Sequence, residues 1–313
     1  MYINAGALET LAAATARAIA LGRAQDAVHC MRIDLAGIVL EARFDDPDAA
    51  FRFARRYRHM PASAAPDVVA YAVAPARGDH YFWIDGGPAY RWNRNVLEAG
   101  GIAFMLDAVA TSAVFALRAD RLTLHAAAVG DGHGVAAIVG TSEAGKTTTA
   151  IACARRGLAL YSDEFCVVTP AGVIAVPRTL GLRAEGVALL ARSAAPPSPV
   201  DAFLRAYAGG DRESVGYDEI FGAVQVPAPA PLRSLFFVAE RAAEPRAQAI
   251  SASAMLPRVA PWTRAQARGA QLAPQLLALL KQIACYELVL GTPDATAQLV
   301  SETLCGARET VRA

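Results

Sequence analysis

The sequence is poor in charged and aromatic residues, and its opposite charges almost cancel. Charged residues make up 19% of the chain, aromatic residues make up 7%, and the formal net charge is +1 at pH 7. A net charge this small gives no broad positive field to attract a polyphosphate chain or an anionic lipid surface. We therefore expect neither nucleic acid nor a membrane among the partners of this protein.

The sequence also lacks an apolar run long enough to cross a bilayer. Its longest apolar segment, residues 101–117, contains Asp107, and a spanning helix needs about 20 predominantly apolar residues. No basic residue precedes the first apolar stretch, and Glu9 and Arg17 interrupt it, which argues against a signal peptide. These features predict a protein that is neither exported nor inserted in a membrane.

Cysteine is scarce and shows no pairing pattern. The five cysteines are widely separated, odd in number, and lack the spacing of a metal site or a redox pair. Because disulfides are rare where cellular reductants keep thiols reduced, we expect reduced, buried thiols in a cytoplasmic protein. The residues are Cys30, Cys153, Cys166, Cys285 and Cys305.

The length of 313 residues and the hydrophobic content of 54% predict two folded domains of α/β type. We expect a smaller N-terminal α+β domain over residues 1–120, which binds a substrate or partner, and a catalytic domain over residues 121–313. Hydrophobic periodicity in the first domain predicts helices over 8–20 and 99–118, strands over 33–44 and 68–74, and a hairpin over 81–92.

Strands and helices alternate in the second domain, which is typical of a helix-flanked α/β sheet. Strands are predicted over 122–129, 134–139, 158–162, 232–239 and 285–290, and a helix over 148–155. Residues 194–225 are rich in Pro, Gly, Ser and charge without a sustained period, so we expect a long loop there. A loop of this length is either a functional lid or an unstructured insertion.

A phosphate-binding pattern follows the strand at 134–139. Its two glycines let the backbone curl, so that successive amides form an anion nest at a helix N-terminus. Lys146 would reach the β- and γ-phosphates of a nucleoside triphosphate, and the Thr147 hydroxyl would bind Mg²⁺. The alternative is a glycine turn that only joins a strand to a helix. The predicted nucleotide-binding residues are Gly140, Thr141, Ser142, Glu143, Ala144, Gly145, Lys146, Thr147 and Thr148.

Two carboxylates follow the strand at 158–162, namely Asp163 and Glu164. In a parallel arrangement, the carboxyl end of this strand would lie beside the phosphate loop. One carboxylate would then orient or deprotonate an acceptor hydroxyl, and the other would hold Mg²⁺. A turn or a helix cap is the structural alternative.

His125 is a single imidazole in the apolar strand 122–129. One interpretation is a core residue whose hydrogen bonds are satisfied. The other is a hydrogen bond to a catalytic carboxylate or phosphate, since the hairpin at 129–135 makes this strand a neighbour of the strand that leads into the phosphate loop.

Together these residues resemble the catalytic domain of HPr kinase/phosphorylase, on His125, residues 140–147, Arg156 with Gly157, and residues 162–164. The resemblance implies a fold similar to the nucleotide domain of phosphoenolpyruvate carboxykinase, transfer of phosphate from ATP to a serine hydroxyl, and a homo-oligomer. It also implies that Lys146 binds phosphate, that Thr147 binds Mg²⁺ and that His125 supports the catalytic centre.

This sequence departs from that family at two places. The family has two aspartates where this chain has Asp163 and Glu164; we assign the base to Asp163 and a metal-binding role to Glu164. The family's later glutamate-arginine-glycine signature is replaced by residues 177–183, which weakens the implication of phosphorylase activity and of HPr as the acceptor and leaves both open. Arg178 and Arg183 in this segment would clamp phosphate, or else are exposed arginines at strand ends.

The sequence thus predicts an ATP- and Mg²⁺-dependent kinase that acts on a serine or similar hydroxyl of a protein or peptide. Divergent relatives of the family phosphorylate precursor peptides of lasso-type natural products, so a natural-product precursor is one possible acceptor by resemblance. Two alternatives remain at this point: a nucleotide-sensing regulatory module without transfer activity, and a kinase for a small metabolite.

Overall fold

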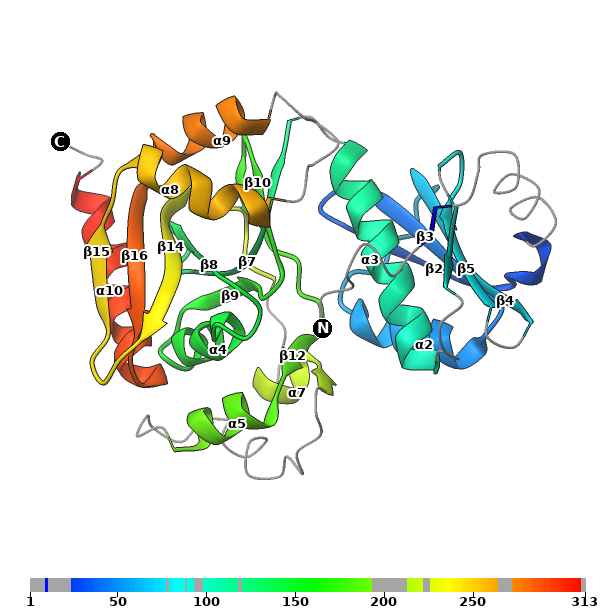
Figure 1. Ribbon diagram of the computed structural model, residues 1–313, viewed down its shortest axis with the longest axis horizontal. Coiled ribbons are helices and arrows are strands. Elements are labelled where there is room, and N and C mark those ends of the chain that lie inside the picture. Colours follow the sequence, from blue (N-terminus) through cyan, green and yellow to red (C-terminus); the bar gives the residue numbers. More distant parts are fainter. Residues whose placement is uncertain are drawn as a thin grey trace. The chain divides into compact units, whose positions relative to one another are not determined.

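The computed structural model describes residues 9–10, 24–76, 79–87, 89–92, 98–117, 120–192, 213–221, 226–263 and 272–310. The chain divides into two compact units, Met1–Arg118 and Ala119–Ala313. Each unit contains a sheet of mixed parallel and antiparallel strands with helices packed on it (Figure 1). The α/β class predicted from the sequence is confirmed.

The first unit is a six-stranded sheet in the order β1-β6-β5-β4-β3-β2. Only β3 and β4 pair in parallel. Helices α2 and α3 pack against each other and on β3, and α3 also contacts β4 and β5 (Figure 1). The elements are β1 (Glu9–Thr10), the short helix η2 (Ala24–Asp26), β2 (His29–Asp34), β3 (Val39–Phe44), α2 (Pro47–Arg56), β4 (Val68–Ala76), β5 (Asp79–Ile84), β6 (Ala89–Trp92) and α3 (Ala99–Leu117).

Local sequence explains where α2 begins and which face it buries. Asp46 caps the helix by accepting a hydrogen bond from the Ala49 amide at 2.9 Å, and Pro47 occupies the first turn, where its missing N–H costs nothing. The fully buried ring of Phe53 packs between Phe44 and Tyr57 at centroid distances of 5.5 and 5.1 Å. This aromatic cluster fixes the helix on the sheet.

One predicted element in this unit is wrong, and another is wrong in the part that the structure describes. The single strand expected over 33–44 is a hairpin, because Ala36 and Gly37 turn the chain with φ of 56° and 80° between β2 and β3. The helix expected over 8–20 falls mostly outside the described residues, and its described part, Glu9–Thr10, is strand β1. The predicted hairpin at 81–92 and helix at 99–118 correspond to β5–β6 and to α3.

The second unit is built on an eight-stranded sheet in the order β11-β10-β7-β8-β14-β16-β15, with β9 paired to β7. The pairs β8–β14 and β14–β16 are parallel, and the other pairs are antiparallel. The strands are β7 (Leu122–Gly130), β8 (Val135–Val139), β9 (Ala159–Ser162), β10 (Phe165–Thr169), β11 (Gly172–Ile174), β14 (Leu232–Arg241), β15 (Arg246–Ala249) and β16 (Ala284–Leu290).

Helices cover both faces of this sheet. All five residues of β8 are buried, as expected for a central strand between two helical layers. Its Ile138 shares a core with helices α4 (Lys146–Arg155) and α10 (Pro293–Thr310). The next residue, Val139, shares the opposite core with helices α8 (Ala252–Val259) and α9 (Leu272–Leu280). Strand alternation therefore places α4 and α8 on different faces.

Between β11 and β14 the chain forms a separate two-stranded sheet. Strand β12 (Leu180–Leu182) leads into helix α5 (Ala184–Ala191) and pairs with β13 (Glu213–Val215), which helix α7 (Tyr217–Phe221) follows. The prediction of a loop over 194–225 is wrong for β13 and α7. Their short lengths gave no periodic signal, and their partner strand is distant in sequence. The rest of that segment lies outside the described residues.

All five cysteines are free thiols. Cys153, Cys166 and Cys285 are buried, as predicted, but Cys30 and Cys305 are exposed. The expectation of buried thiols is therefore wrong for these two, which lie on a strand with an exposed edge and near the end of the last helix.

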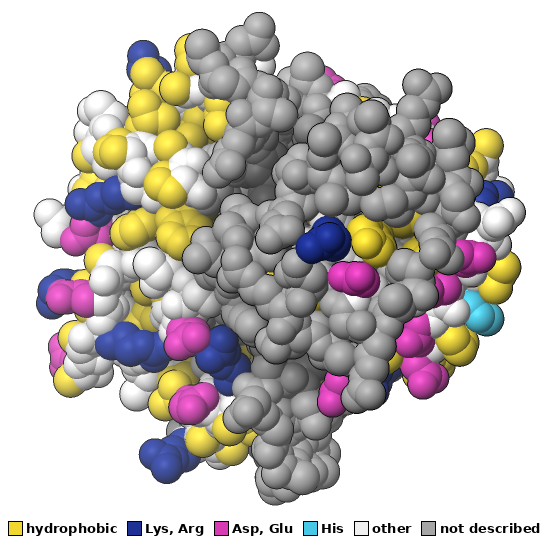
Figure 2. All heavy atoms as spheres, turned by 45° about the vertical axis from the view of Figure 1, so that its right-hand side comes forward, with side chains coloured by type: hydrophobic (Ala, Val, Ile, Leu, Met, Phe, Trp, Pro, Cys, Tyr) yellow, Lys and Arg dark blue, Asp and Glu magenta, His cyan; other side chains and the backbone are white. Residues whose placement is uncertain are grey.

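The described surface is mixed in charge. Figure 2 shows basic and acidic side chains interspersed with apolar ones on one face. Within the parts of the chain that the structure describes, no helix is long and apolar enough to span a membrane.

Candidate functional site

The phosphate-loop pattern occupies the connection between β8 and α4. Glu143 and Gly145 both adopt positive φ, at 68° and 103°, and α4 begins at Lys146. The Ala144 amide donates a hydrogen bond to the Thr141 carbonyl at 3.2 Å and closes a turn. Left-handed residues next to right-handed ones turn amides to one side of the chain, and a helix N-terminus adds positive potential there. The backbone thus has the form of an anion nest.

Both glycines of the pattern are needed for space. A Cβ at Gly140 would lie 3.1 Å from the Val238 Cβ and 3.3 Å from the Ala144 Cβ. A Cβ at Gly145 would lie 2.6 Å from Nη2 of Arg241, and the backbone there has a φ that L side chains rarely adopt. The glycines therefore do more than join a strand to a helix; they keep this loop against the end of β14.

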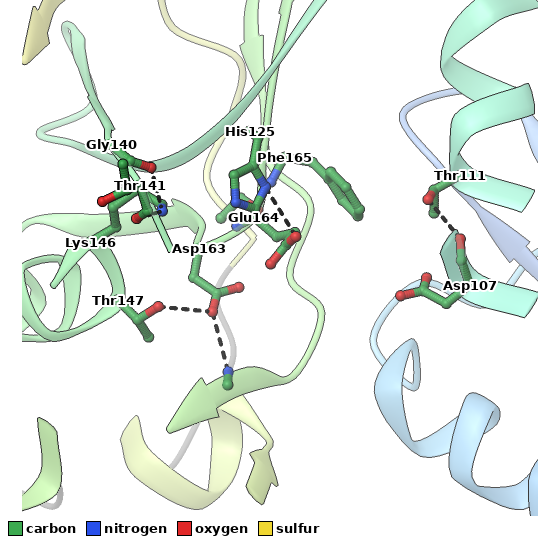
Figure 3. Close-up of polar contacts among 12 residues, drawn as sticks. Asp107, Thr111, His125, Gly140, Thr141, Lys146, Thr147, Asp163, Glu164 and Phe165 are labelled. Carbon is green, nitrogen blue, oxygen red and sulfur yellow. Dashed lines mark hydrogen bonds and ion pairs between the residues drawn. The ribbon is translucent and has the colours of Figure 1, made fainter. Parts of the chain in front are cut away.

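Lys146 is buried, with 8% of its surface exposed. Its Nζ donates hydrogen bonds to the carbonyls of Gly140 and Thr141 at 2.8 and 2.9 Å, so the ammonium lies within the loop (Figure 3). It also lies 5.9 Å from the ring centroid of Trp262. Carbonyl oxygens are thus among the partners of the ammonium beside the loop, and a charged phosphate oxygen is a stronger acceptor than a carbonyl.

The other predicted nucleotide-binding side chains differ in exposure. Thr141, Ser142 and Glu143 are exposed, whereas Thr147 and Thr148 on the first turn of α4 are half-buried. The Thr147 hydroxyl reaches an acidic residue, at 3.5 Å from Oδ2 of Asp163.

Asp163 comes directly after β9 and is 5% exposed. Its Oδ2 also accepts a hydrogen bond from the Gly181 amide at 3.3 Å. From the sequence we expected that β9 runs parallel to β8, which would bring Asp163 to the phosphate loop. Instead β7 lies between them, antiparallel to both β8 and β9. Strands β8 and β9 therefore still run in the same direction, and their carboxyl ends bring Thr147 and Asp163 together (Figure 3).

Glu164 lies beside His125, with Oε1 3.0 Å from the imidazole Nδ1 (Figure 3). The antiparallel register of β7 with β10 places Phe165 opposite His125 and fixes this approach. The Ser162 hydroxyl accepts the amides of Glu164 and Phe165 at 3.2 and 3.0 Å, so the two acids also form a tight turn. The structural and the chemical interpretations of this pair are therefore compatible.

The geometry divides the two acids differently from the sequence-based assignment. Glu164 was expected to share a metal with Thr147, but the carboxylate beside Thr147 is that of Asp163, whereas Glu164 lies on the His125 side. The side chain of His125 is 13% exposed and belongs to this polar group rather than to an apolar core.

The two arginines predicted to clamp phosphate, Arg178 and Arg183, have different surroundings. Arg178 is 7% exposed, and its guanidinium lies 5.0 Å from the ring centroid of Phe165, so the interpretation as an exposed strand-end residue is wrong for it. Arg183 forms an ion pair of 2.8 Å with Glu143 of the loop, and the two side chains are 35% and 62% exposed. Arg178 thus belongs to the buried site near the acids, and Arg183 to the rim of the loop.

Three further residues lie at the site and were not identified from the sequence. Trp262, in the short helix η3 (Ala260–Trp262), has its ring 6.0 Å from that of His125. Arg241, at the end of β14, donates to the Ala144 carbonyl at 3.2 Å. Burial, and then the nearby Asp163 carboxylate, raise the pKa of Tyr217 well above its usual value, while Arg178 opposes this shift. No sequence motif marks these residues, since tertiary folding alone brings them in.

The oxygens of the site suit a Mg²⁺ ion that binds together with a phosphate ligand. Among the described residues, no group of three His, Cys, Asp or Glu side chains gathers as a metal site. Mg²⁺ prefers a few protein oxygens together with phosphate oxygens and water. The Thr147 hydroxyl and the Asp163 carboxylate are oxygens of that kind, and the adjacent nest would hold the phosphates.

No model of a known protein family matches this chain, and no curated protein matches it. The evidence for a function therefore consists of the residues of this site and their geometry.

Proposed function

We propose that this chain is an ATP- and Mg²⁺-dependent kinase that transfers the γ-phosphate to a serine or similar hydroxyl of a protein or peptide. The observation that carries the proposal is the approach of Thr147 to Asp163 at 3.5 Å. It joins a loop suited to phosphates to a buried carboxylate that can receive a proton. A phosphate loop alone indicates a ligand, and the adjacent carboxylate adds the group that phosphoryl transfer needs to receive the acceptor proton.

Lys146 and the loop backbone would bind the phosphates. The Lys146 ammonium exchanges its two carbonyl partners for phosphate oxygens, which are stronger acceptors because they are charged. The Gly145 backbone and the first turn of α4 add amide donors at the positive end of the helix.

Thr147 would hold Mg²⁺, which offsets the negative charge that develops during phosphoryl transfer. Asp163 would take the proton from the acceptor hydroxyl. At the same time the hydroxyl oxygen would bond to the γ-phosphorus, and the bond from that phosphorus to the ADP oxygen would break. His125 and Glu164 would support the centre as a pair, with Glu164 orienting the imidazole instead of binding the metal.

The proposal includes the fold relationship that the resemblance implies. The second unit would be an HPr kinase-like domain related to the phosphoenolpyruvate carboxykinase nucleotide domain, and the first unit would contact the acceptor or a partner. A cytoplasmic homo-oligomer acting on a serine-bearing protein or peptide belongs to the same proposal.

The lysine content of the chain permits a direct test of nucleotide binding. Lys146 and the exposed Lys281 are its two lysines. An acyl phosphate derivative of ATP acylates an amine that lies beside its bound phosphates. We expect mass spectrometry to find the acyl group on Lys146, and excess Mg·ATP to block the modification. Equal modification of both lysines would contradict a specific site.

Transfer is tested with γ-labelled ATP and lysate of the source cells, followed by separation of the labelled products by size. We expect labelled protein or peptide, a loss of labelling in Lys146→Met, and unchanged labelling in the matched control Lys281→Met. Label only in the small-molecule fraction would indicate a metabolite kinase. Tight ATP binding without any labelled product would indicate a nucleotide sensor instead.

A further inference from the structure

The hydroxyl of Tyr217 is a buried polar group that the proposed chemistry has not yet used. Tyr217 is 4% exposed, and its ring packs edge-on against Phe221 at a centroid distance of 6.4 Å. Within the described part of the chain, its hydroxyl makes no hydrogen bond. Burial of an unpaired hydroxyl is unfavourable, because the bonds to water that the group loses are not replaced. Such a group therefore indicates a partner that the described residues do not supply.

The pairing of β12 with β13 brings the start of α7, where Tyr217 lies, next to the start of β12. Leu180 pairs with Val215 in this antiparallel ladder. Arg178 precedes Leu180 and Tyr217 follows Val215 by the same two positions, so both residues extend beyond the same end of the ladder. The amide of Gly181, the middle residue of β12, donates to Asp163 at 3.3 Å and ties the ladder to the carboxylate.

The chemistry of the group makes it a donor. Because burial and the Asp163 carboxylate both raise the pKa of Tyr217, its phenol keeps the proton across the physiological range. A phenol in that state donates a hydrogen bond without charge. The neighbouring Thr179 hydroxyl is also buried, 5% exposed, and makes no hydrogen bond within the described residues. Two polar groups without partners among the described residues therefore lie next to the β12–β13 ladder, Thr179 directly before β12 and Tyr217 at the start of α7.

We propose that Tyr217 binds the phosphate acceptor, by donating a hydrogen bond to the oxygen of the hydroxyl that Asp163 deprotonates. This inference rests on the proposed kinase function. The acceptor oxygen gives its proton to Asp163, accepts the Tyr217 hydrogen bond, and directs a remaining lone pair at the γ-phosphorus. The new O–P bond forms as the bond to ADP breaks, and Tyr217 keeps its own proton throughout. The acceptor is therefore a neutral alcohol that enters from the side of β12 and α7.

The test is Tyr217→Phe in the full chain, with γ-labelled ATP and source-cell lysate as probes. We expect the initial rate of label transfer at saturating ATP to fall by about tenfold or more, which corresponds to the loss of one directed hydrogen bond. The Kd for Mg·ATP should stay within about twofold, because the variant leaves Lys146 and the loop backbone unchanged. The Tm should be unchanged or higher, since the variant removes an unpaired buried hydroxyl.

Tyr161→Phe is the matched control. Tyr161 is also a buried tyrosine of the second unit, but its hydroxyl donates to the Ala228 carbonyl at 2.9 Å. This variant should lower the Tm and leave the transfer rate per folded molecule unchanged.

Three results would overturn the inference. Transfer by Tyr217→Phe within about twofold of the wild type would show that the hydroxyl does not bind the acceptor. A Tm lowered as in Tyr161→Phe would show that it has a structural partner. A wild-type protein that transfers no label would overturn the kinase function itself, and this inference with it.

Discussion

Oδ2 of Asp163 lies between the Thr147 hydroxyl, at 3.5 Å, and the Gly181 amide, at 3.3 Å. One carboxylate oxygen thus connects α4, the helix that starts at the phosphate loop, with β12 of the two-stranded sheet. The amide hydrogen bond fixes the direction of the side chain, and Thr147 marks where a metal-bound phosphate would lie. The acid is therefore held in place before any ligand binds, as efficient proton transfer requires.

Asp163→Asn should separate catalysis from binding. The amide keeps the shape of the side chain but cannot accept the acceptor proton, so we expect transfer to fall by about 100-fold or more. The affinity for Mg·ATP should change little, because Lys146 and the loop backbone remain. Initial rates with labelled ATP and calorimetric titration with Mg·ATP measure the two quantities.

A parallel loss of both quantities would contradict the base role of Asp163. Titration of the variant with Mg²⁺ at fixed ATP then identifies the cause. A higher Mg²⁺ requirement would assign Asp163 to the metal, together with Thr147.

Much of the site could be predicted from the sequence because its parts are local. The loop at 140–147 is a contiguous pattern whose glycines are needed for backbone conformation and space, and Asp163 and Glu164 follow a strand directly. The division of labour between the two acids could not be predicted, because it depends on the strand order β9-β7-β8 and on the register that pairs His125 with Phe165.

Residues brought in by tertiary contacts gave no signal at all. Trp262, Arg241 and Tyr217 lie on elements separated from the loop by many residues, and nothing in their local sequence sets them apart. In the first unit the apolar pattern over 33–44 correctly predicted strand, but it gave no sign of the turn at Ala36 and Gly37. An alanine at positive φ is rare, so sequence reasoning continues the strand through it.

Gly145→Ala should weaken nucleotide binding through its effect on the backbone. The alanine would have to adopt the φ of 103° that Gly145 has. Its Cβ would lie 2.6 Å from Arg241 Nη2 and 3.1 Å from Leu290 Cδ1. The loop must rearrange, and we expect a stability loss of about 1–2 kcal/mol together with at least a tenfold loss of Mg·ATP affinity. Urea unfolding and calorimetry measure these effects.

Gly157→Ala is the matched control for that variant. Gly157 also has positive φ, at 92°, but nothing lies within 4 Å of the position that its Cβ would take. We expect a similar loss of stability with unchanged nucleotide affinity. Loss of affinity in both variants would mean that general destabilisation explains the effect.

The pair of His125 and Glu164 should behave as one unit. We expect His125→Asn and Glu164→Gln each to lower transfer by about 10- to 100-fold, and the double variant to be no worse than the more damaging single variant, because each residue acts through the other. Full additivity of the two effects in a double-mutant cycle of kcat/KM would contradict this coupling.

Trp262 should report nucleotide binding by fluorescence. The Lys146 ammonium lies 5.9 Å from its ring centroid, so movement of that charge onto phosphates changes the field at the indole. We expect Mg·ATP to change the emission, and Trp262→Phe to abolish the change. The other two tryptophans, Trp83 and Trp92, belong to the first unit and provide a constant background. An unchanged signal in Trp262→Phe would assign the response to the first unit.

The cysteines predict how stability depends on alkaline pH. Burial raises the pKa of the Cys153 and Cys166 thiols to about 12, from an ordinary value of 9.0. Above pH 9 the unfolded chain loses these protons while the folded chain keeps them. The free energy of unfolding should therefore be fully retained below pH 9 and fall above it, by up to about 1.4 kcal/mol per pH unit for each thiol.

Urea unfolding between pH 8 and 10.5 tests this, with the double variant Cys153→Ala, Cys166→Ala as the comparison. The variant starts from a lower stability but should lose less of it as the pH rises. Native protein should also react with N-ethylmaleimide only at the exposed Cys30 and Cys305, and urea-unfolded protein at all five cysteines. If the native protein is alkylated at Cys153 or Cys166 at pH 7, those thiols are reached through local opening, and the slope above pH 9 should be correspondingly smaller.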